Sequence, residues 1–514
     1  MKRAIDFIKT AAIYILTASM LTFTGLYINE KQNAGKEEGI PADKMRILES
    51  MMGTAPLTGA DKNHIKPLQI TVTADGRSYT AVYNENAVSD IYEHFIRGIT
   101  GIFGSGSKCV RLDKEEGDKL WRECTEKENS AYIRYAGNYL YPVIYAFWEN
   151  IWDAEMFPGE LAMVNELFIA DFDPYYGIAR DTSGSVAVFI PEQKTNYLIG
   201  ELLVPASLCS AYENIGAIPG EFAGSKDIGA KTGINKNDIK HLVFPATFYF
   251  SHDHNTYSSA LRFSNPLMDE SGKMDTGKNY IRELFKHLNF NFESSNSYYA
   301  KNRIMIRDGQ NTVYLYNDGK AVYTSGESAD GSGKVHLSKF LGYDAAYYTY
   351  YEKIKAASIF VGKLSKELTG NESSLLLKSA ATDADGNLLI IFSYYYEGIQ
   401  IRVNGSDEGI SLKIDKDSIA ELTINTLDVS SQNMDMIKDK NFALELSIID
   451  GIISRELEKE ELQKEEIAKK YKLIYDKDLD KFILNALEPI YNINYAHIGG
   501  EGGLATAVRE IIEK

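Results

Sequence analysis

The chain contains 514 residues, of which 55 are Lys or Arg and 72 are Asp or Glu, so its formal net charge is −17. Hydrophobic residues make up 44% and charged residues 25%, a globular composition that excludes a largely disordered or fibrous chain. At roughly 150 residues per domain, the length corresponds to about three domains. The acidic balance argues against nucleic acid as a partner, because binding to the phosphate backbone needs a basic surface.

An apolar segment lies close to the N-terminus. Residues 11–28 contain no charged side chain, and a helix of that length just crosses a hydrocarbon core of about 30 Å. Basic residues from Lys2 to Lys9 precede it, so the positive-inside tendency places residues 1–10 in the cytoplasm and the ectodomain outside the cell. A cleaved signal peptide is the alternative, but the segment is long and lacks an Ala-x-Ala exit site. We therefore predict a single-pass membrane protein with a stalk at residues 29–63.

Alternating patterns predict antiparallel strands in the ectodomain. Residues 67–83 alternate apolar and polar side chains around an Asp-Gly turn, and residues 312–325 do the same, which is the hairpin signature. Residues 185–200 resemble another hairpin, and the aromatic residues 132–148 are expected to form strand. Within residues 388–425, short turns containing Gly or Asp separate strand patterns, which favours an antiparallel meander.

Apolar residues at helical spacing predict amphipathic helices. Ile91, Phe95 and Ile99 lie on one face of a predicted helix over residues 87–102. A second helix is expected around Trp121. A third is marked by apolar residues that recur between positions 354 and 368.

Composition shifts suggest how the ectodomain is divided. The Gly-rich polar residues 210–240 mark one boundary, and the loop at 326–334 is a predicted linker. The predicted domains are therefore 64–235, 236–333 and 334–514. Because strands and helices do not alternate as βαβ units, the predicted class is α+β: an N-terminal transmembrane helix followed by about three mixed domains with antiparallel sheets.

Two candidate sites combine residue types that can support chemistry. His252 and His254 flank one residue, so on a strand both imidazoles would point to one face and could bind zinc. No other histidine follows at a matching spacing, and a surface turn explains the pair better. Asp171 and Asp173 resemble the carboxylate pair of a glycosidase, but we expect them to flank a turn at Pro174.

Loops that resemble short ligand-binding motifs depart from them in detail. Residues 383–387 begin like a calcium loop, but the Gly comes two places early and the final Glu is absent, so we expect a turn. In residues 101–108 a Ser separates the second Gly from the Lys of a phosphate loop. The same loop contains a Ser-x-x-Lys as in β-lactamases, yet the Lys-Thr-Gly at 231–233 precedes the Ser-x-Asn at 294–296 instead of following it. The sequence therefore predicts no catalytic residue, no metal site and no cofactor.

The cysteine and tyrosine contents leave alternatives open. Cys109, Cys124 and Cys209 are too few for a disulfide scaffold, and Cys109 and Cys124 either pair or remain buried free thiols. The chain has 34 tyrosines, with clusters at 343–351 and 394–396. Tyrosine suits both half-buried strand faces and protein-binding patches, and packing is the expected role.

Several stretches, taken together, resemble a known family. They are the N-terminal anchor, residues 65–83 as an opening strand region, residues 302–325 as a middle hairpin, residues 395–415 as a C-terminal sheet, and a closing segment with Leu487, Pro489 and Tyr491. In pattern and order they are similar to the YycH/YycI family, and most of all to its YycH-like members. These are extracytoplasmic accessory proteins of the WalK (YycG) sensor kinase in Gram-positive bacteria.

The resemblance implies a function and a set of partners. The family has no catalytic residues, and its transmembrane helix contacts the helices of the kinase. Ala18, Thr22 and Gly25 are the candidate contact residues here, because small side chains let helices approach closely. The expected partners are a membrane sensor histidine kinase, a paralogous accessory protein and the lipid bilayer. We therefore predict a non-enzymatic regulator of a cell-envelope two-component system; the alternative is a membrane-anchored envelope enzyme or glycan-binding protein.

Overall fold

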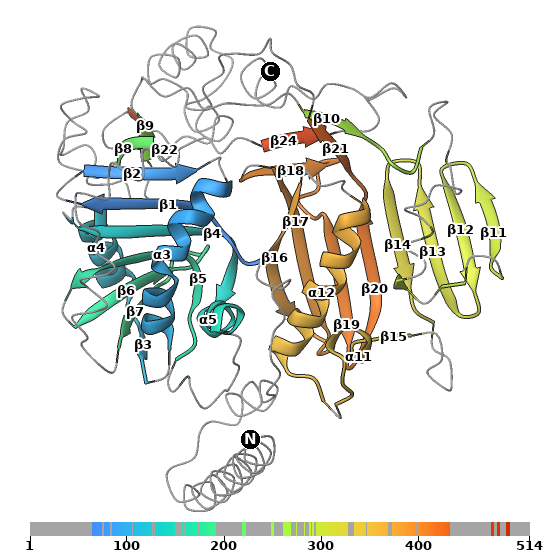
Figure 1. Cartoon of the computed structure of the whole chain (residues 1–514), viewed down its shortest axis with the longest axis horizontal. Coiled ribbons are helices and arrows are strands. Elements are labelled where there is room, and N and C mark those ends of the chain that lie inside the picture. The colour runs from blue at the N-terminus through green and yellow to red at the C-terminus, as the bar shows by residue number, and fades with distance from the viewer. Residues whose placement is uncertain are drawn as a thin grey trace, which may run out of the picture. The chain divides into compact units, whose positions relative to one another are not determined.

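The computed structural model describes residues 64–191 and 261–431 with short gaps, together with short strands at 218–222, 248–250, 474–476, 481–483 and 490–493 (Figure 1). These residues belong to one unit, Met51–Lys514. The expected membrane segment at 11–28 and the stalk at 29–63 lie outside the described residues. Within the described part of the chain, no helix is both long and apolar enough to cross a membrane.

The first large sheet is antiparallel, with the strand order β3-β7-β6-β5-β4-β1-β2-β8-β9. Its strands are β1 (Pro67–Ala74), β2 (Arg77–Val82), β3 (Lys108–Arg111), β4 (Ser130–Leu140), β5 (Met163–Phe172), β6 (Tyr175–Arg180), β7 (Val186–Ile190), β8 (Ile218–Phe222) and β9 (Phe248–Phe250). Ala74 pairs with Arg77, so the hairpin predicted around the first Asp-Gly turn is confirmed. For the hairpin predicted at 185–200, only the first strand, β7, lies in the described residues.

Helices α3 (Glu85–Phe103), α4 (Lys114–Thr125) and α5 (Tyr141–Glu149) accompany this sheet. The predicted apolar face of α3 is confirmed, because Ile91, Phe95 and Ile99 are all buried. The strand expected over residues 132–148 is wrong in its second half, where α5 follows β4 directly. Pro142 occupies the second position of α5. The first N–H groups of a helix have no partner within the helix, so proline is tolerated there although it lacks an N–H group. A continuous apolar run does not distinguish a buried strand from a buried helix.

The second large sheet contains eleven strands in the order β11-β12-β13-β14-β20-β19-β17-β18-β24, with β15 paired to β20 and β16 to β17. Its strands are β11 (Asn296–Ala300), β12 (Arg303–Asp308), β13 (Asn311–Tyr316), β14 (Lys320–Thr324), β15 (Val335–His336), β16 (Ser374–Thr382), β17 (Leu388–Tyr396), β18 (Ile399–Val403), β19 (Ile410–Asp415), β20 (Ser418–Asn425) and β24 (Ile490–Ile493). All pairs are antiparallel except β18–β24. Short two-stranded sheets join β10 (Leu261–Ser264) to β21 (Asp428–Ser431) and β22 (Ile474–Asp476) to β23 (Lys481–Ile483).

Helix α12 (Tyr350–Leu368) packs on β16, β17 and β19, and the short α11 (Ser338–Leu341) precedes it (Figure 1). The predicted helix is confirmed, since Ile354, Ala357, Val361 and Leu364 are buried on one face. The α+β class with antiparallel sheets is likewise confirmed. The boundaries predicted for the three domains stay predictions, although β14 and β20 lie side by side in one sheet.

The predicted meander differs from the observed strand order in one respect. Strands β18 and β19 do not pair with each other, because both pair with β17. The nine residues of β17 are enough for both: β18 pairs with residues 394–396 and β19 with residues 388–392. The antiparallel direction of these pairs is as predicted.

Candidate functional site

The two large sheets meet where β4 of the first sheet contacts β16 of the second. Tyr139 on β4 donates its hydroxyl proton to the backbone carbonyl of Leu377 on β16. Tyr395 on β17 donates in the opposite direction, to the carbonyl of Ala136 at 3.4 Å. Tyrosine side chains from each sheet therefore bond to the backbone of the other, and the tyrosines near 394–396 pack as expected.

The backbones approach closely at the same place. The register of β4 shifts between Arg134 and Tyr139, and that of β16 shifts between Leu377 and Ser379. A β-bulge bends its strand and frees backbone groups from the ladder. Gly137 lies inside the first shift, and a Cβ atom there would stand 2.2 Å from the carbonyl oxygen of Lys378. The contact between the sheets therefore requires glycine at this position.

His64 ties the start of β1 to the second sheet. Its Nδ1 lies 2.6 Å from the carbonyl oxygen of Leu375, and its ring meets Phe392 edge-on at 5.4 Å. The imidazole is buried, and desolvation lowers the pKa of His64, although hydrogen bonds to the backbone of Leu375 and Ser358 oppose this effect. A neutral ring with its proton on Nδ1 donates a hydrogen bond to the carbonyl oxygen of Leu375. His64 therefore holds the segment before β1 against the second sheet.

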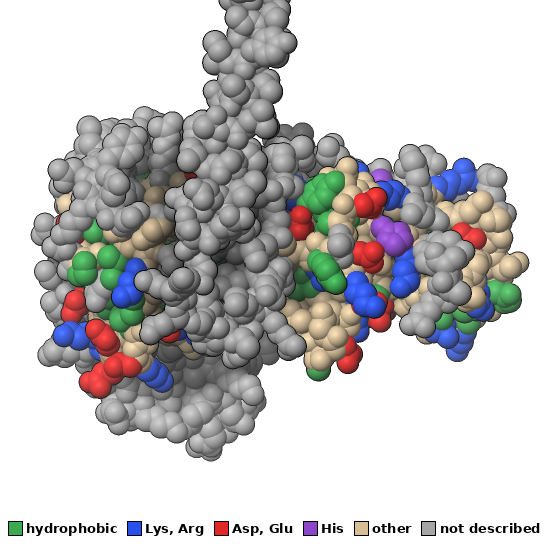
Figure 2. All heavy atoms as spheres, turned by 90° about the horizontal axis from the view of Figure 1, so that it is seen from below, with side chains coloured by type: hydrophobic (Ala, Val, Ile, Leu, Met, Phe, Trp, Pro, Cys, Tyr) green, Lys and Arg blue, Asp and Glu red, His purple; other side chains and the backbone are tan. Residues whose placement is uncertain are grey.

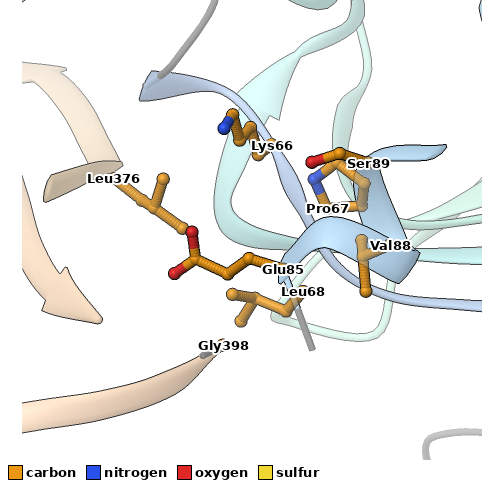
Figure 3. Close-up of a pocket in the computed structure, with 8 residues that line it drawn as sticks. All are labelled: Lys66, Pro67, Leu68, Glu85, Val88, Ser89, Leu376 and Gly398. Carbon is orange, nitrogen blue, oxygen red and sulfur yellow. The ribbon is translucent and has the colours of Figure 1, made fainter. Parts of the chain in front are cut away.

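A small pocket opens beside this junction (Figure 3). It encloses about 310 Å³, including space open to solvent, and is lined by Lys66, Pro67, Leu68, Glu85, Val88, Ser89, Leu376 and Gly398. Glu85 extends from α3 towards Leu376 of the second sheet, and its carboxylate accepts a hydrogen bond of 2.9 Å from the hydroxyl of Ser374. We take this junction pocket as the candidate functional site, because both sheets contribute to its walls.

The lining of the junction pocket combines two charged groups with an apolar wall. It holds one carboxylate, Glu85, and one ammonium group, Lys66, beside an apolar wall. Glycoside hydrolysis needs a pair of carboxyl groups on either side of the scissile bond. Much of this space is open to solvent, and the enclosed part has room for about one water molecule, so the pocket is a shallow recess that suits at most a small polar group.

A second polar cluster lies buried in the first sheet. The hydroxyl of Tyr132 donates to Glu166 Oε1 at 2.6 Å, and Arg180 Nη2 lies 3.6 Å from Asp118 Oδ1. The guanidinium of Arg180 is 5.5 Å from the ring of Trp121, a cation–π contact. Burial raises the pKa of Glu166, although the hydrogen bond from Tyr132 and the nearby arginines oppose it. Because Arg180 and Glu166 are almost completely enclosed, this cluster stabilises the fold and does not face a ligand.

Both described cysteines are free and buried. Cys109 lies on β3, and Cys124 lies on the buried face of α4, in a core cluster with Trp121 and Tyr132. Of the two alternatives, the buried free thiols are therefore correct. Burial raises the pKa of Cys109 to about 12 and that of Cys124 well above its ordinary value, so neither is a reactive thiolate.

Two loops singled out from the sequence lie in the described residues, and the turn predicted at residues 383–387 is present. At residues 383–387, Asp383 Oδ1 accepts the backbone N–H groups of Asp385 at 3.0 Å and Asn387 at 2.8 Å, which closes a turn. Desolvation raises the pKa of Asp383, but hydrogen bonds from Asn387, Lys413 and Asp385 outweigh it and lower the pKa to about 2. At residues 101–108 the loop follows helix α3 and precedes strand β3, the reverse of the order in a phosphate loop.

The remaining candidates are only partly described. Asp171 is exposed on β5 just before the turn to β6, and Asp173 lies outside the described residues. The partner-contact candidates Ala18, Thr22 and Gly25 also lie outside them, as do His252, His254 and the Lys-Thr-Gly at 231–233. Among the residues that are described, no group of at least three His, Cys, Asp or Glu side chains could hold a metal ion.

One feature of the contact between the sheets, the close approach at Gly137, could have been predicted from the local sequence. A glycine inside an otherwise aromatic strand, as at Gly137, indicates a bulge or a close backbone approach. The hydrogen bonds of His64 and Glu85 could not be predicted in this way, because their partners lie 311 and 289 positions away in the chain.

The fold and the junction pocket define a class: an α+β protein of two large, mainly antiparallel sheets tied by side-chain-to-backbone bonds. No model of a protein family matches the sequence, and no curated protein matches it. Among solved structures, the chain is similar to YycH from Bacillus subtilis, with 9% sequence identity, coverage of 74% of this chain and 85% of that chain, and a TM-score of 0.38. The resemblance to YycH predicted from the sequence is thus found again in the structure. This similarity concerns the fold alone.

Proposed function

We propose that the chain is a non-enzymatic, single-pass membrane protein that regulates a sensor histidine kinase of a cell-envelope two-component system. The observation that carries the proposal is the combination of a charge-free segment at 11–28, with basic residues before it, and an ectodomain whose sequence resembles the YycH/YycI family. The stretches that carry the resemblance at 65–83, 302–325 and 395–415 are folded largely as strands of the two large sheets.

In this proposal the membrane segment makes the kinase contact. Lipid provides no hydrophobic force between helices, so their association depends on close packing and on polar contacts. On a helix, Ala18, Thr22 and Gly25 share one face and allow a partner backbone to approach. The junction pocket then gives the ectodomain a place where a bound group would touch both sheets.

Photo-crosslinking in native membranes tests the proposal. A photoreactive residue is placed at Ala18, Thr22 or Gly25, and matched controls carry it at Leu16 and Met20 on the opposite face. We expect a sensor kinase in the products of the first set and much less in those of the controls. The full chain, reconstituted with that kinase, should also change its rate of autophosphorylation. A product set without a kinase, or a kinase rate that is unaffected by the chain, contradicts the proposal.

A further inference from the structure

Strand β11 is an edge of the eleven-stranded sheet, and its outer side is open. It pairs with β12, and no other described strand pairs with it. All five of its residues are exposed, and Tyr298 and Tyr299 are exposed by 54% and 74%. In natural sheets, charged side chains, proline or bulges usually prevent such an edge from pairing with another strand. β11 contains no charged residue and no proline, so its free N–H and C=O groups can accept another strand.

The face of the sheet beside this edge has the composition of a protein interface. Strand register places Tyr298, Met305 and Tyr314 in one row across β11, β12 and β13. The side chains of that row are half-buried or exposed, whereas the alternate residues Ile306 and Val313 point into the core. Tyrosine, methionine and arginine are the residue types that interfaces concentrate.

Positive charges flank this row. Arg303 lies over the rings of Tyr314 at 5.1 Å and Tyr316 at 6.0 Å, and Arg307 donates to the carbonyl of Gly309 at 3.1 Å. Neither guanidinium has a carboxylate partner among the described residues. Lys320 shares the face, on which β11 to β14 present no acidic side chain. Figure 2, which looks at the molecule from below, shows Lys and Arg side chains together with an acidic side chain at the right-hand end, where these strands lie in Figure 1.

We propose that β11 and this face form a docking surface for an extended acidic segment of another protein. The charge of the face selects the partner, because three cations without acidic neighbours on these strands complement carboxylates. A strand added along β11 would make main-chain hydrogen bonds and place alternate side chains on the face. The inference does not rest on the proposed function, since it follows from the edge and its charges alone.

The register of the sheet also predicts the pattern of the segment. Arg303 lies opposite Ala300 and Arg307 lies opposite Asn296, so small side chains on β11 leave both arginines within reach of an added strand. Tyr298 lies between these rows. The fitting segment therefore reads Glu-x-apolar-x-Glu, with both carboxylates and the apolar side chain on the same side.

A synthetic peptide, Thr-Glu-Val-Tyr-Val-Glu-Thr with a fluorescent label, serves as the probe, and a peptide with Lys for Glu is its control. The full chain is held in nanodiscs of zwitterionic lipid, so that lipid charge does not contribute. We expect the Glu peptide to bind at least about tenfold more tightly than the Lys peptide. Arg303→Gln with Arg307→Gln should weaken the Glu peptide about tenfold, whereas Lys119→Gln with Arg122→Gln, two exposed cations of α4, should not.

Hydrogen exchange then distinguishes binding by strand addition along β11 from binding by electrostatic attraction alone. Strand addition protects the amides of β11 only when the Glu peptide is bound. The proposal is overturned if the peptide does not bind at about 1 mM, if the arginine variant binds it normally, or if β11 gains no protection. It is also overturned if β11 is already protected in a dimer of the chain without peptide, because a second copy then occupies the edge. Binding of vesicles with anionic lipid through the same arginines, without protection of β11, likewise overturns it and assigns the face to a membrane.

Discussion

Replacing Gly137 by alanine tests the contact between the two sheets directly. The new Cβ atom would lie 2.2 Å from the carbonyl oxygen of Lys378 and 2.8 Å from that of Leu377. Real Cβ atoms essentially never approach other atoms within 3.0 Å, so β4 and β16 must move apart by about 0.8 Å. Both clashing atoms belong to backbone and cannot rotate away. We therefore expect Gly137→Ala to lower the free energy of unfolding by about 3 kcal/mol.

The matched control is Gly386→Ala, in the turn between β16 and β17. There the alanine Cβ meets nothing within 4 Å, but the backbone φ of +86° disfavours a side chain. We expect a loss of about 1 kcal/mol, from backbone strain alone. Urea unfolding of the full chain in detergent, followed by tryptophan fluorescence, gives both values.

Hydrogen exchange locates the effect of Gly137→Ala. Faster exchange should appear in β4 and β16 and not in the distant β11–β13 hairpins. A loss below about 0.5 kcal/mol, with exchange in β4 and β16 unchanged, would show that the sheets separate freely and that their contact is not tight.

Three further expectations concern other parts of the chain. The raised pKa of buried Glu166 means that the folded state holds a proton more strongly than the unfolded state, so stability falls as the pH rises above the ordinary glutamate pKa. Glu166→Gln should remove that part of the pH dependence in urea titrations, and an unchanged slope would refute it. Cys109 and Cys124 should resist iodoacetamide at pH 8 until the chain is unfolded, as mass spectrometry can check, and rapid labelling of the native chain would contradict their burial. Protease added to intact cells should digest the ectodomain and spare residues 1–28, whereas protection of the whole chain would reverse the predicted topology.

Local signals in the sequence predicted the parts of the fold that local interactions make. The Asp318-Gly319 turn indicates the β13–β14 hairpin, because Gly319 adopts the positive φ of +83° that this turn needs. The apolar spacing in α3 and α12 likewise indicates the face that each helix buries. Where the signal was only apolar, as in α5, it did not separate helix from strand.

The contact between the two sheets was not predicted, for a physical reason. Tyr139 and Leu377 are separated by 238 positions, and the bond joins a side chain to a carbonyl group that every residue possesses. Such a pair leaves no mark in either local sequence. Periodicity shows that Tyr139 is buried but not which strand covers it, so the partner of β4 became known only from the structure.

Because β14 pairs with β20, the second sheet cannot form all at once during synthesis: strands β11 to β14 are made well before β20. The hairpins from β11 to β14 are local and close within microseconds of their synthesis. Their inner edge, however, waits for β20, which begins about 94 residues after β14 ends. At about 5–20 residues per second, that edge stays unpaired for about 5–20 s. During this interval the ribbon has two open edges, which makes it a segment of the chain in particular need of a chaperone.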